Sequence, residues 1–200
     1  MDCSIDQISE LPDIKSLMST AQALALLDAI IMPEWDDRLF SFNANWDGCG
    51  KEMMASMRDG GGSEYFMTFN EQGVVGKVFC GQVISDSVQQ MEKIPPVFDS
   101  FKSEPAFSIE SASFYYWRES TEQSWHSSPA ELKSYALLGF LVGGVEAYKR
   151  CVREYYEKEV NDFIVGQVFE SLSVSESQLS LLNPDLKLTD LVGDYREIVG

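Results

Sequence analysis

The stretch WDGCGKEMMASMRDGGGSEYFMTFNEQGVVGK, residues 46–77, decides the fold of this chain. Its segments 52–58, 64–69 and 74–80 have the length and composition of β-strands, and short Asp- and Gly-containing turns separate them. Glycine adopts the positive φ of such turns without a steric penalty. Residues 39–46 add a strand before them, because apolar and polar residues alternate there. The pattern predicts an antiparallel meander.

Alternation within these strands also predicts which side chains share a face. Tyr65, Met67 and Phe69 should lie on one face of the third strand. In residues 39–46 the expected inward set is Phe40, Phe42, Ala44 and Trp46.

Helices are predicted around the meander. Residues 1–18 are expected to be a weakly ordered lead-in, followed by a helix over 21–32 that Ser19 and Gln22 would cap. Beyond the meander, short helices are predicted at 85–93 and from Pro96, then a strand at 112–118 and a polar loop at 119–128.

The last third of the chain is nearly free of strand patterning and predicts helices at 130–142, 145–159, 161–172, 175–182 and 189–198. We therefore predict an α+β fold in which a twisted antiparallel meander of about five strands packs with helices. The prediction is a single domain over 1–200, with lead-in 1–18, helix plus sheet 19–128, and helical section 129–200 packed on it.

Composition bounds the class of protein. The chain has 200 residues, of which 44% are hydrophobic and 24% charged, as in soluble globular proteins. The longest apolar run, residues 136–145, is about half the length of a membrane span. The acidic N-terminus lacks the features of a secretory signal, and the four cysteines form no CxxC pair. These features predict a cytoplasmic protein with reduced thiols, no membrane association and no zinc site.

The chain is strongly acidic, with 32 acidic against 15 basic residues and a formal charge of −17. The acidity is spread along the sequence, and it would repel nucleic acid and favour a basic protein partner. The alternative is that the charge serves solubility alone. The oligomeric state is left open.

Aromatic and arginine side chains on the sheet are the predicted binding residues, because exposed Trp, Tyr and Arg dominate protein recognition. The set is Trp46, Arg58, Tyr65, Tyr115, Trp117, Arg118 and Trp125. The alternative is that the C-terminal helices cover the outward face and make these residues part of a core.

No complete catalytic signature is present, so no catalytic residue and no cofactor are predicted. His126, the single histidine, lies in the predicted polar loop without a linked nucleophile. Asp36, Asp37, Asp47, Asp59 and Glu64 are expected to be able to cluster at one end of the sheet, and Asp47, Asp59 and Glu64 offer an alternative metal or hydrolytic site. Aspartate is also common in turns because it hydrogen-bonds its own backbone.

Several short motifs occur in a fixed order along this chain. They are WDG at 46–48, DGGGSEYF at 59–66, GVVGK at 73–77, EPAF at 104–107, YWR at 116–118, EYY at 154–156 and LNPDL at 182–186. In this order the chain resembles a family of uncharacterised bacterial proteins, from about residue 40 to the end. The family has no established activity, so the resemblance implies no functional residue. Members of the family often carry a His-Glu pair just after the fourth strand, a region that reads Phe79-Cys80-Gly81-Gln82 in this chain.

Three functions therefore stand as hypotheses. The first is a non-catalytic interaction module, one form of which is an immunity-type inhibitor that covers a basic toxin or nuclease. The second is a small hydrolase or metal-dependent enzyme that uses the turn carboxylates. The third is an oligomeric structural protein.

Overall fold

The computed structural model describes residues 3–130 and 132–200 and has an α+β architecture, as predicted. Its strands form one antiparallel sheet in which each strand pairs with the next along the chain. Within the described residues the strands are β1 (Phe40–Asn43), β2 (Met53–Arg58), β3 (Glu64–Asn70), β4 (Gly73–Phe79), β5 (Phe114–Glu119) and β6 (His126–Ser128). The predicted meander is therefore confirmed and gains a sixth strand.

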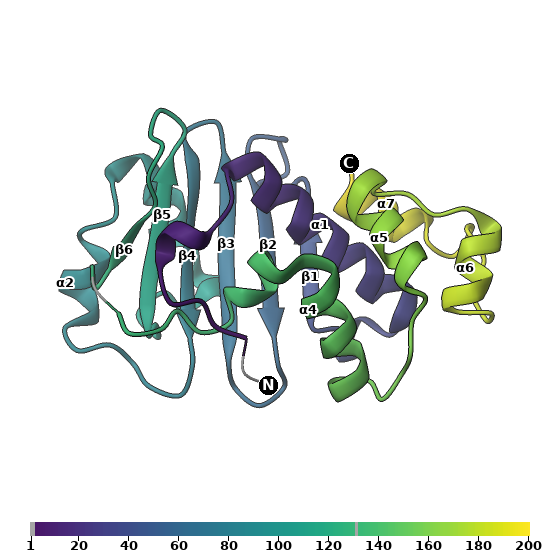
Figure 1. Cartoon of the computed structure of the whole chain (residues 1–200). Helices are drawn as coiled ribbons and strands as arrows, with labels where there is room; N and C mark the ends of the chain where they lie inside the picture. Colours follow the sequence, from purple (N-terminus) through teal and green to yellow (C-terminus); the bar gives the residue numbers. More distant parts are fainter. Residues whose placement is uncertain (1–2, 131) are drawn as a thin grey trace.

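The helices are α1 (Ile14–Ile31), α2 (Ser87–Met91), α3 (Asp99–Ser103), α4 (Gly139–Tyr155), α5 (Asp162–Ser171), α6 (Glu176–Leu182) and α7 (Val192–Ile198). Short 3-10 turns are η1 (Ile8–Glu10), η2 (Trp35–Asp37), η3 (Pro96–Phe98) and η4 (Pro105–Phe107). Helices α1 and α4 lie over one face of the sheet, and α5, α6 and α7 extend beyond its β1 edge (Figure 1).

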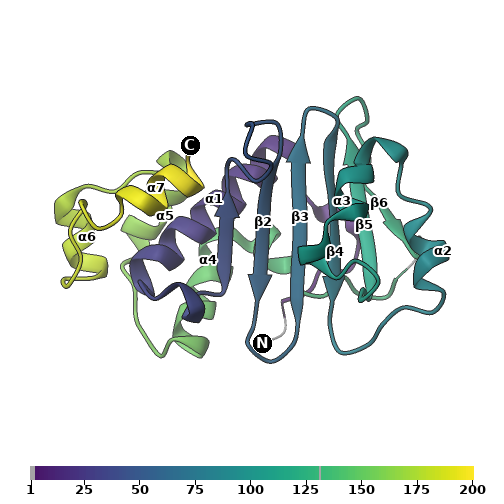
Figure 2. The ribbon, with the colours of Figure 1, turned by 180° about the vertical axis from the view of Figure 1, so that it is seen from behind.

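The opposite face of the sheet is covered by residues 94–112 and not by the C-terminal helices. This segment, with η3, α3 and η4, lies over β3, β4 and β5 (Figure 2). Its Phe98, Phe101 and Phe107 are fully buried and form a second core with Phe66 and Tyr115 from the sheet. The alternative in which the C-terminal helices cover the outward face is therefore wrong about the covering segment. Residues 94–112 bury Tyr115 and Trp117 on this face instead.

The strand register sorts side chains between the two cores. Tyr65, Met67 and Phe69 all belong to the α1 side, as predicted. On this side Tyr116 crosses Gly76, where a Cβ atom would lie 2.4 Å from Tyr116 Cζ. Only glycine leaves room for that ring, so the packing of β5 against β4 depends on it.

The N-terminal prediction is corrected in two ways. Helix α1 begins at Ile14, because the Asp13 carboxylate accepts hydrogen bonds from Lys15 N at 3.0 Å and Ser16 N at 3.1 Å. The predicted cap at Ser19 lies inside the helix. Ile5 is buried and bridges to Tyr135, so the described part of the lead-in is packed.

Three further boundaries differ from the prediction. Strand β1 ends at Asn43, because the Asn43 side chain accepts a hydrogen bond from Asn45 N and starts a turn. Trp46 therefore packs against the second core and does not share the face of Phe40. The predicted loop 119–128 contains β6. The helix predicted at 130–142 begins only at Gly139.

Helix α1 is also the most apolar helix of the chain. Over its 18 residues the mean hydropathy is 1.4, so by length and composition alone it could cross a membrane. A helix buried in a core has the same composition, and in this structure α1 is mostly buried between the sheet and the C-terminal helices. It is longer than the run at 136–145 that stood out in the sequence.

Candidate functional site

The connection from α1 to β1 carries the most exposed tryptophan of the structure. It contains η2, and Arg38 holds it in place. Arg38 Nε donates to Met32 O at 2.9 Å, its Nη2 donates to Pro33 O at 2.7 Å, and its Nη1 pairs with Asp194 on α7. The loop is therefore fixed at the surface by a partly buried arginine.

Trp35 lies on this loop with 53% of its surface exposed. The Arg58 guanidinium, at the end of β2, lies 5.8 Å from the centre of the Trp35 ring and 5.3 Å from that of Phe66. These distances are those of cation–π contacts. The ring is thus held against the end of the sheet while most of its area faces solvent.

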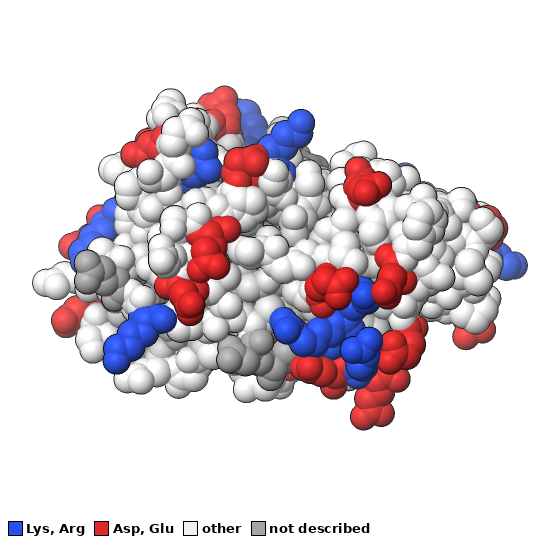
Figure 3. Space-filling view, viewed as in Figure 1, with Lys and Arg blue, Asp and Glu red and all other residues white. Residues whose placement is uncertain are grey.

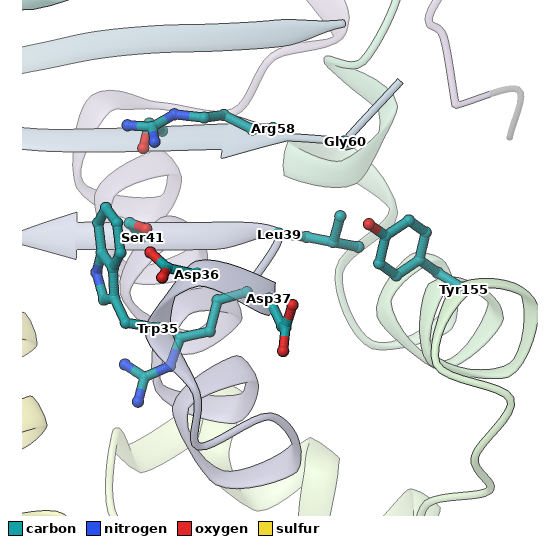
Figure 4. Close-up of a pocket in the computed structure, with 10 residues that line it drawn as sticks. Trp35, Asp36, Asp37, Leu39, Ser41, Arg58, Gly60 and Tyr155 are labelled. Carbon is teal, nitrogen blue, oxygen red and sulfur yellow. The ribbon is translucent and has the colours of Figure 1, made fainter. Parts of the chain in front are cut away.

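A hollow of about 230 Å³ lies between this loop and the end of α4. Tyr155 stands on the side opposite Trp35, and Ser41 and Arg58 lie at the sheet side (Figure 4). Tyr155 is 43% exposed and packs edge-on against Tyr156. We call Glu34, Trp35, Asp36 and Asp37, with Arg58 and Tyr155, the Trp35 site.

The carboxylates of the Trp35 site are exposed and unpaired. Within the described residues, Glu34, Asp36 and Asp37 form no side-chain hydrogen bond and no ion pair. The charged residues of α4 differ from them, because Lys149 pairs with Glu146 and Asp162. Basic and acidic side chains lie side by side over α4 (Figure 3). The Trp35 site is therefore a local excess of negative charge beside an exposed indole.

A buried carboxylate lies beneath this loop. Asp28 of α1 is 0% exposed and accepts four hydrogen bonds, from Leu39 N, Phe40 N, and the hydroxyls of Tyr148 and Tyr156. Burial raises the pKa of Asp28 from 3.8 to about 6, and the four donors oppose that rise.

The seven predicted binding residues are dispersed. Tyr65, Tyr115, Trp117 and Trp125 are buried in the cores, between 0% and 8% exposed. Trp46 is half-buried and stacks on Phe107.

The two predicted arginines lie in different places. Arg118 is half-buried; its Nε donates to Glu122 O and its guanidinium lies over Trp125. Arg58 alone of the predicted set lies in the Trp35 site.

The three carboxylates of the alternative metal site are not brought together. Asp47 lies in the β1–β2 turn, whereas Asp59 and Glu64 lie at the opposite end of β2. Asp59 accepts from Gly61 N and Ser63 N in its own turn, and Glu64 pairs with buried Lys77. Within residues 3–130 and 132–200 no group of three His, Cys, Asp or Glu is placed to hold a metal ion.

The side chains that could act as a base or a nucleophile, His126 and Cys49, do not contact each other in the structure. His126 lies in β6, 3.0 Å from Glu122 Oε2, and stacks on Trp117. The exposed Cys49 thiol donates to Asp47 Oδ2 at 2.9 Å, an interaction that raises the pKa of the thiol and, with other hydrogen bonds, lowers that of Asp47 to about 2. A thiol with a raised pKa is a poor nucleophile at neutral pH.

A larger hollow of about 820 Å³ lies between the β1–β2 and β3–β4 turns. Its lining is Gly50, Lys51, Glu52, Met53, Asn70, Glu71 and Gln72. It has no aromatic side chain, so it lacks the recognition chemistry of the Trp35 site.

Sequence reasoning missed Trp35 and Tyr155 as surface residues. A signal was available for Trp35, since PEWDD at 33–37 places a tryptophan among three acids in a segment with no periodicity. Tyr155 follows Tyr148 and Val152 at helical spacing, a pattern that indicates the buried face of a helix and so hides a surface residue.

Comparisons of the chain with family models, curated proteins and solved structures find no match. The resemblance to the bacterial family therefore stays a prediction and brings no functional residue to this chain.

Proposed function

We propose that this chain is a non-catalytic interaction module that binds a basic protein through the Trp35 site. One form of this function is an immunity-type inhibitor, which would cover a cationic surface of a toxin or nuclease. The observation that carries the proposal is an exposed indole flanked by Glu34, Asp36 and Asp37, all without a basic partner among the described residues.

The chemistry of the site favours a protein over other ligands. Tryptophan, tyrosine and arginine are the side chains that dominate protein interfaces, and Trp35, Tyr155 and Arg58 surround one hollow. The hollow, at about 230 Å³, is small for a small-molecule site, which usually measures about 300–1,000 Å³ and is mainly apolar.

Charge gives the class of partner. The whole chain has a formal charge of −17, and the carboxylates of the Trp35 site contribute to it. The electric field of this negative charge accelerates the encounter with a cationic protein and repels nucleic acid. Lysine or arginine side chains of the partner would pair with Asp36 and Asp37, and an apolar or cationic group would cover Trp35.

The test is capture of partners from a lysate of the source cells at low and moderate salt. The bait is the wild-type chain or a variant with Trp35→Ala, Asp36→Asn and Asp37→Asn. A matched control carries Phe163→Ala, Glu170→Gln and Asp185→Asn.

The control removes one exposed large apolar side chain and two exposed carboxylates with no ion pair among the described residues, as the site variant does. We expect the wild type and the control to retain the same basic protein, which salt releases, and the site variant to lose it. Equal retention by the site variant would refute the proposal, and so would a retained partner that is acidic.

A further inference from the structure

One residue fastens both ends of the loop that carries the Trp35 site. At the first end, the main-chain oxygen of Asp28 accepts a hydrogen bond from Met32 N at 2.8 Å. At the second end, Asp28 Oδ2 accepts from Leu39 N at 2.8 Å and from Phe40 N at 2.9 Å. The loop between residues 32 and 39 is therefore closed onto a single buried aspartate.

Two tyrosines donate to the same carboxylate, Tyr148 from within helix α4 and Tyr156 from directly after its end, and they differ in one respect. Tyr148 donates only to Asp28 Oδ1, at 3.1 Å. Tyr156 donates to Asp28 Oδ2 at 2.8 Å, accepts from Leu39 N at 3.0 Å, and lies 3.4 Å from Asp37 O. Tyr156 thus contacts the loop itself, and its neighbour Tyr155 lines the hollow.

We propose that Asp28 and Tyr156 are positioning residues of the Trp35 site, which couple its shape to helix α4 and to the charge of the buried carboxylate. The inference rests on the function proposed above for that site. Asp28 sets where the chain enters β1, and Tyr156 holds Asp37 and Tyr155 on their two sides of the hollow.

The charge of Asp28 matters because, among the described residues, no lysine or arginine forms an ion pair with it. The titratable groups around the carboxylate are Tyr148 and Cys151 of α4, Tyr156 directly after α4, and Tyr65 of β3. All are uncharged at neutral pH. Protonation leaves one acceptor position fewer for the four donors, so it weakens the hydrogen bonds that hold the loop. It also relieves the cost of burying a charge, and for that reason it stabilises the folded chain against unfolding even as these hydrogen bonds weaken.

The two tyrosines supply a matched pair of variants, because each change removes one hydroxyl from the same carboxylate. Octa-arginine serves as the cationic probe, and octa-glutamate as its control. NMR follows affinity and the indole N–H signal of Trp35, which a Trp35→Phe variant assigns.

We expect Tyr156→Phe to move the Trp35 signal and to weaken octa-arginine binding by about threefold to tenfold, the effect of one lost hydrogen bond. Tyr148→Phe should leave both unchanged. Wild-type affinity should fall from about pH 7 to about pH 5, and Asp28→Asn should abolish that change. If Asp28→Asn fails to fold, the tyrosine pair still decides the question.

The inference is overturned if Tyr148→Phe acts as strongly as Tyr156→Phe, or if Tyr156→Phe leaves the Trp35 signal in place. Failure of the proposed function is distinguishable from this result. If the proposed function fails, the wild-type protein will not bind octa-arginine in a salt-sensitive way. The Trp35 signal of the tyrosine variants would still show whether Tyr156 positions the loop.

Discussion

Replacing Asp28 with asparagine changes how the stability of the protein depends on pH. Asparagine keeps the shape of the side chain and one acceptor oxygen, but it does not ionise. Asp28 has its pKa raised by burial from 3.8 to about 6, against the opposing effect of four hydrogen-bond donors. The folded protein therefore binds this proton more tightly than the unfolded chain does.

The sign and size of the effect follow from that difference. Asp28 contributes most to the free energy of unfolding below about pH 4, and this contribution is lost as the pH rises through about 6. A shift from 3.8 to about 6, at about 1.4 kcal/mol per pKa unit, is worth about 3 kcal/mol. The wild type should therefore lose about 3 kcal/mol relative to Asp28→Asn between about pH 4 and about pH 7.

The assay is urea unfolding of both proteins, followed by tryptophan fluorescence across this pH range. Comparing the two proteins cancels the pH dependence that the other acidic residues contribute. A stability difference that stays constant with pH would refute the reasoning. A difference that shifts toward the wild type as the pH rises would show that the four donors outweigh burial.

Three further predictions concern the scaffold. Gly76→Ala should lower the free energy of unfolding by about 1–3 kcal/mol in denaturant titrations, because the new Cβ would meet the fully buried Tyr116 ring. The same change made in a Tyr116→Leu protein should cost less, because the ring is absent there. Lys77→Met should lower the free energy of unfolding by about 1–3 kcal/mol, because the buried ammonium donates hydrogen bonds to Ser108 O, Ser111 O and Glu64. An unchanged melting temperature would contradict this prediction. Asp13→Ala should lower helix stability, measured by hydrogen exchange at the start of α1, whereas Asp13→Asn keeps the capping acceptor and should not.

The sheet was predictable because its signals are local. Strands β2, β3 and β4 are short segments that are buried on both faces, and turns rich in glycine or asparagine connect them, so segment length and turn residues agree. The start of α1 was not predictable in this way. Asp13 and Ser19 are both good capping residues, and the packing of Ile14 and Leu17 on the core decides between them.

The second core shows a limit of pattern reasoning. Phe98, Phe101 and Phe107 do not follow the period of one helix, since they belong to two 3-10 turns and a short helix. Their burial depends on the sheet face beneath them. The face of an aromatic residue on β5 could be predicted by alternation, but whether another segment covers it could not.

The Trp35 site was predictable only in part. Arg58 was found because it ends a clear strand. Trp35 lies in a segment without periodicity, and its partner across the hollow, Tyr155, is 120 residues away in the sequence. Contact between such distant segments is set by the packing of α4 on α1, which no local pattern encodes.

The most direct measurement of the proposed function is photo-crosslinking from the site itself. A photoreactive p-benzoylphenylalanine replaces Asp36 in the Trp35 site or, as control, Asp185, an exposed aspartate in the turn after α6. After irradiation in the source lysate, we expect one basic protein to be attached at position 36 and none at position 185. Attachment at both positions, or at position 185 alone, would contradict the assignment of the Trp35 site as the partner-binding surface.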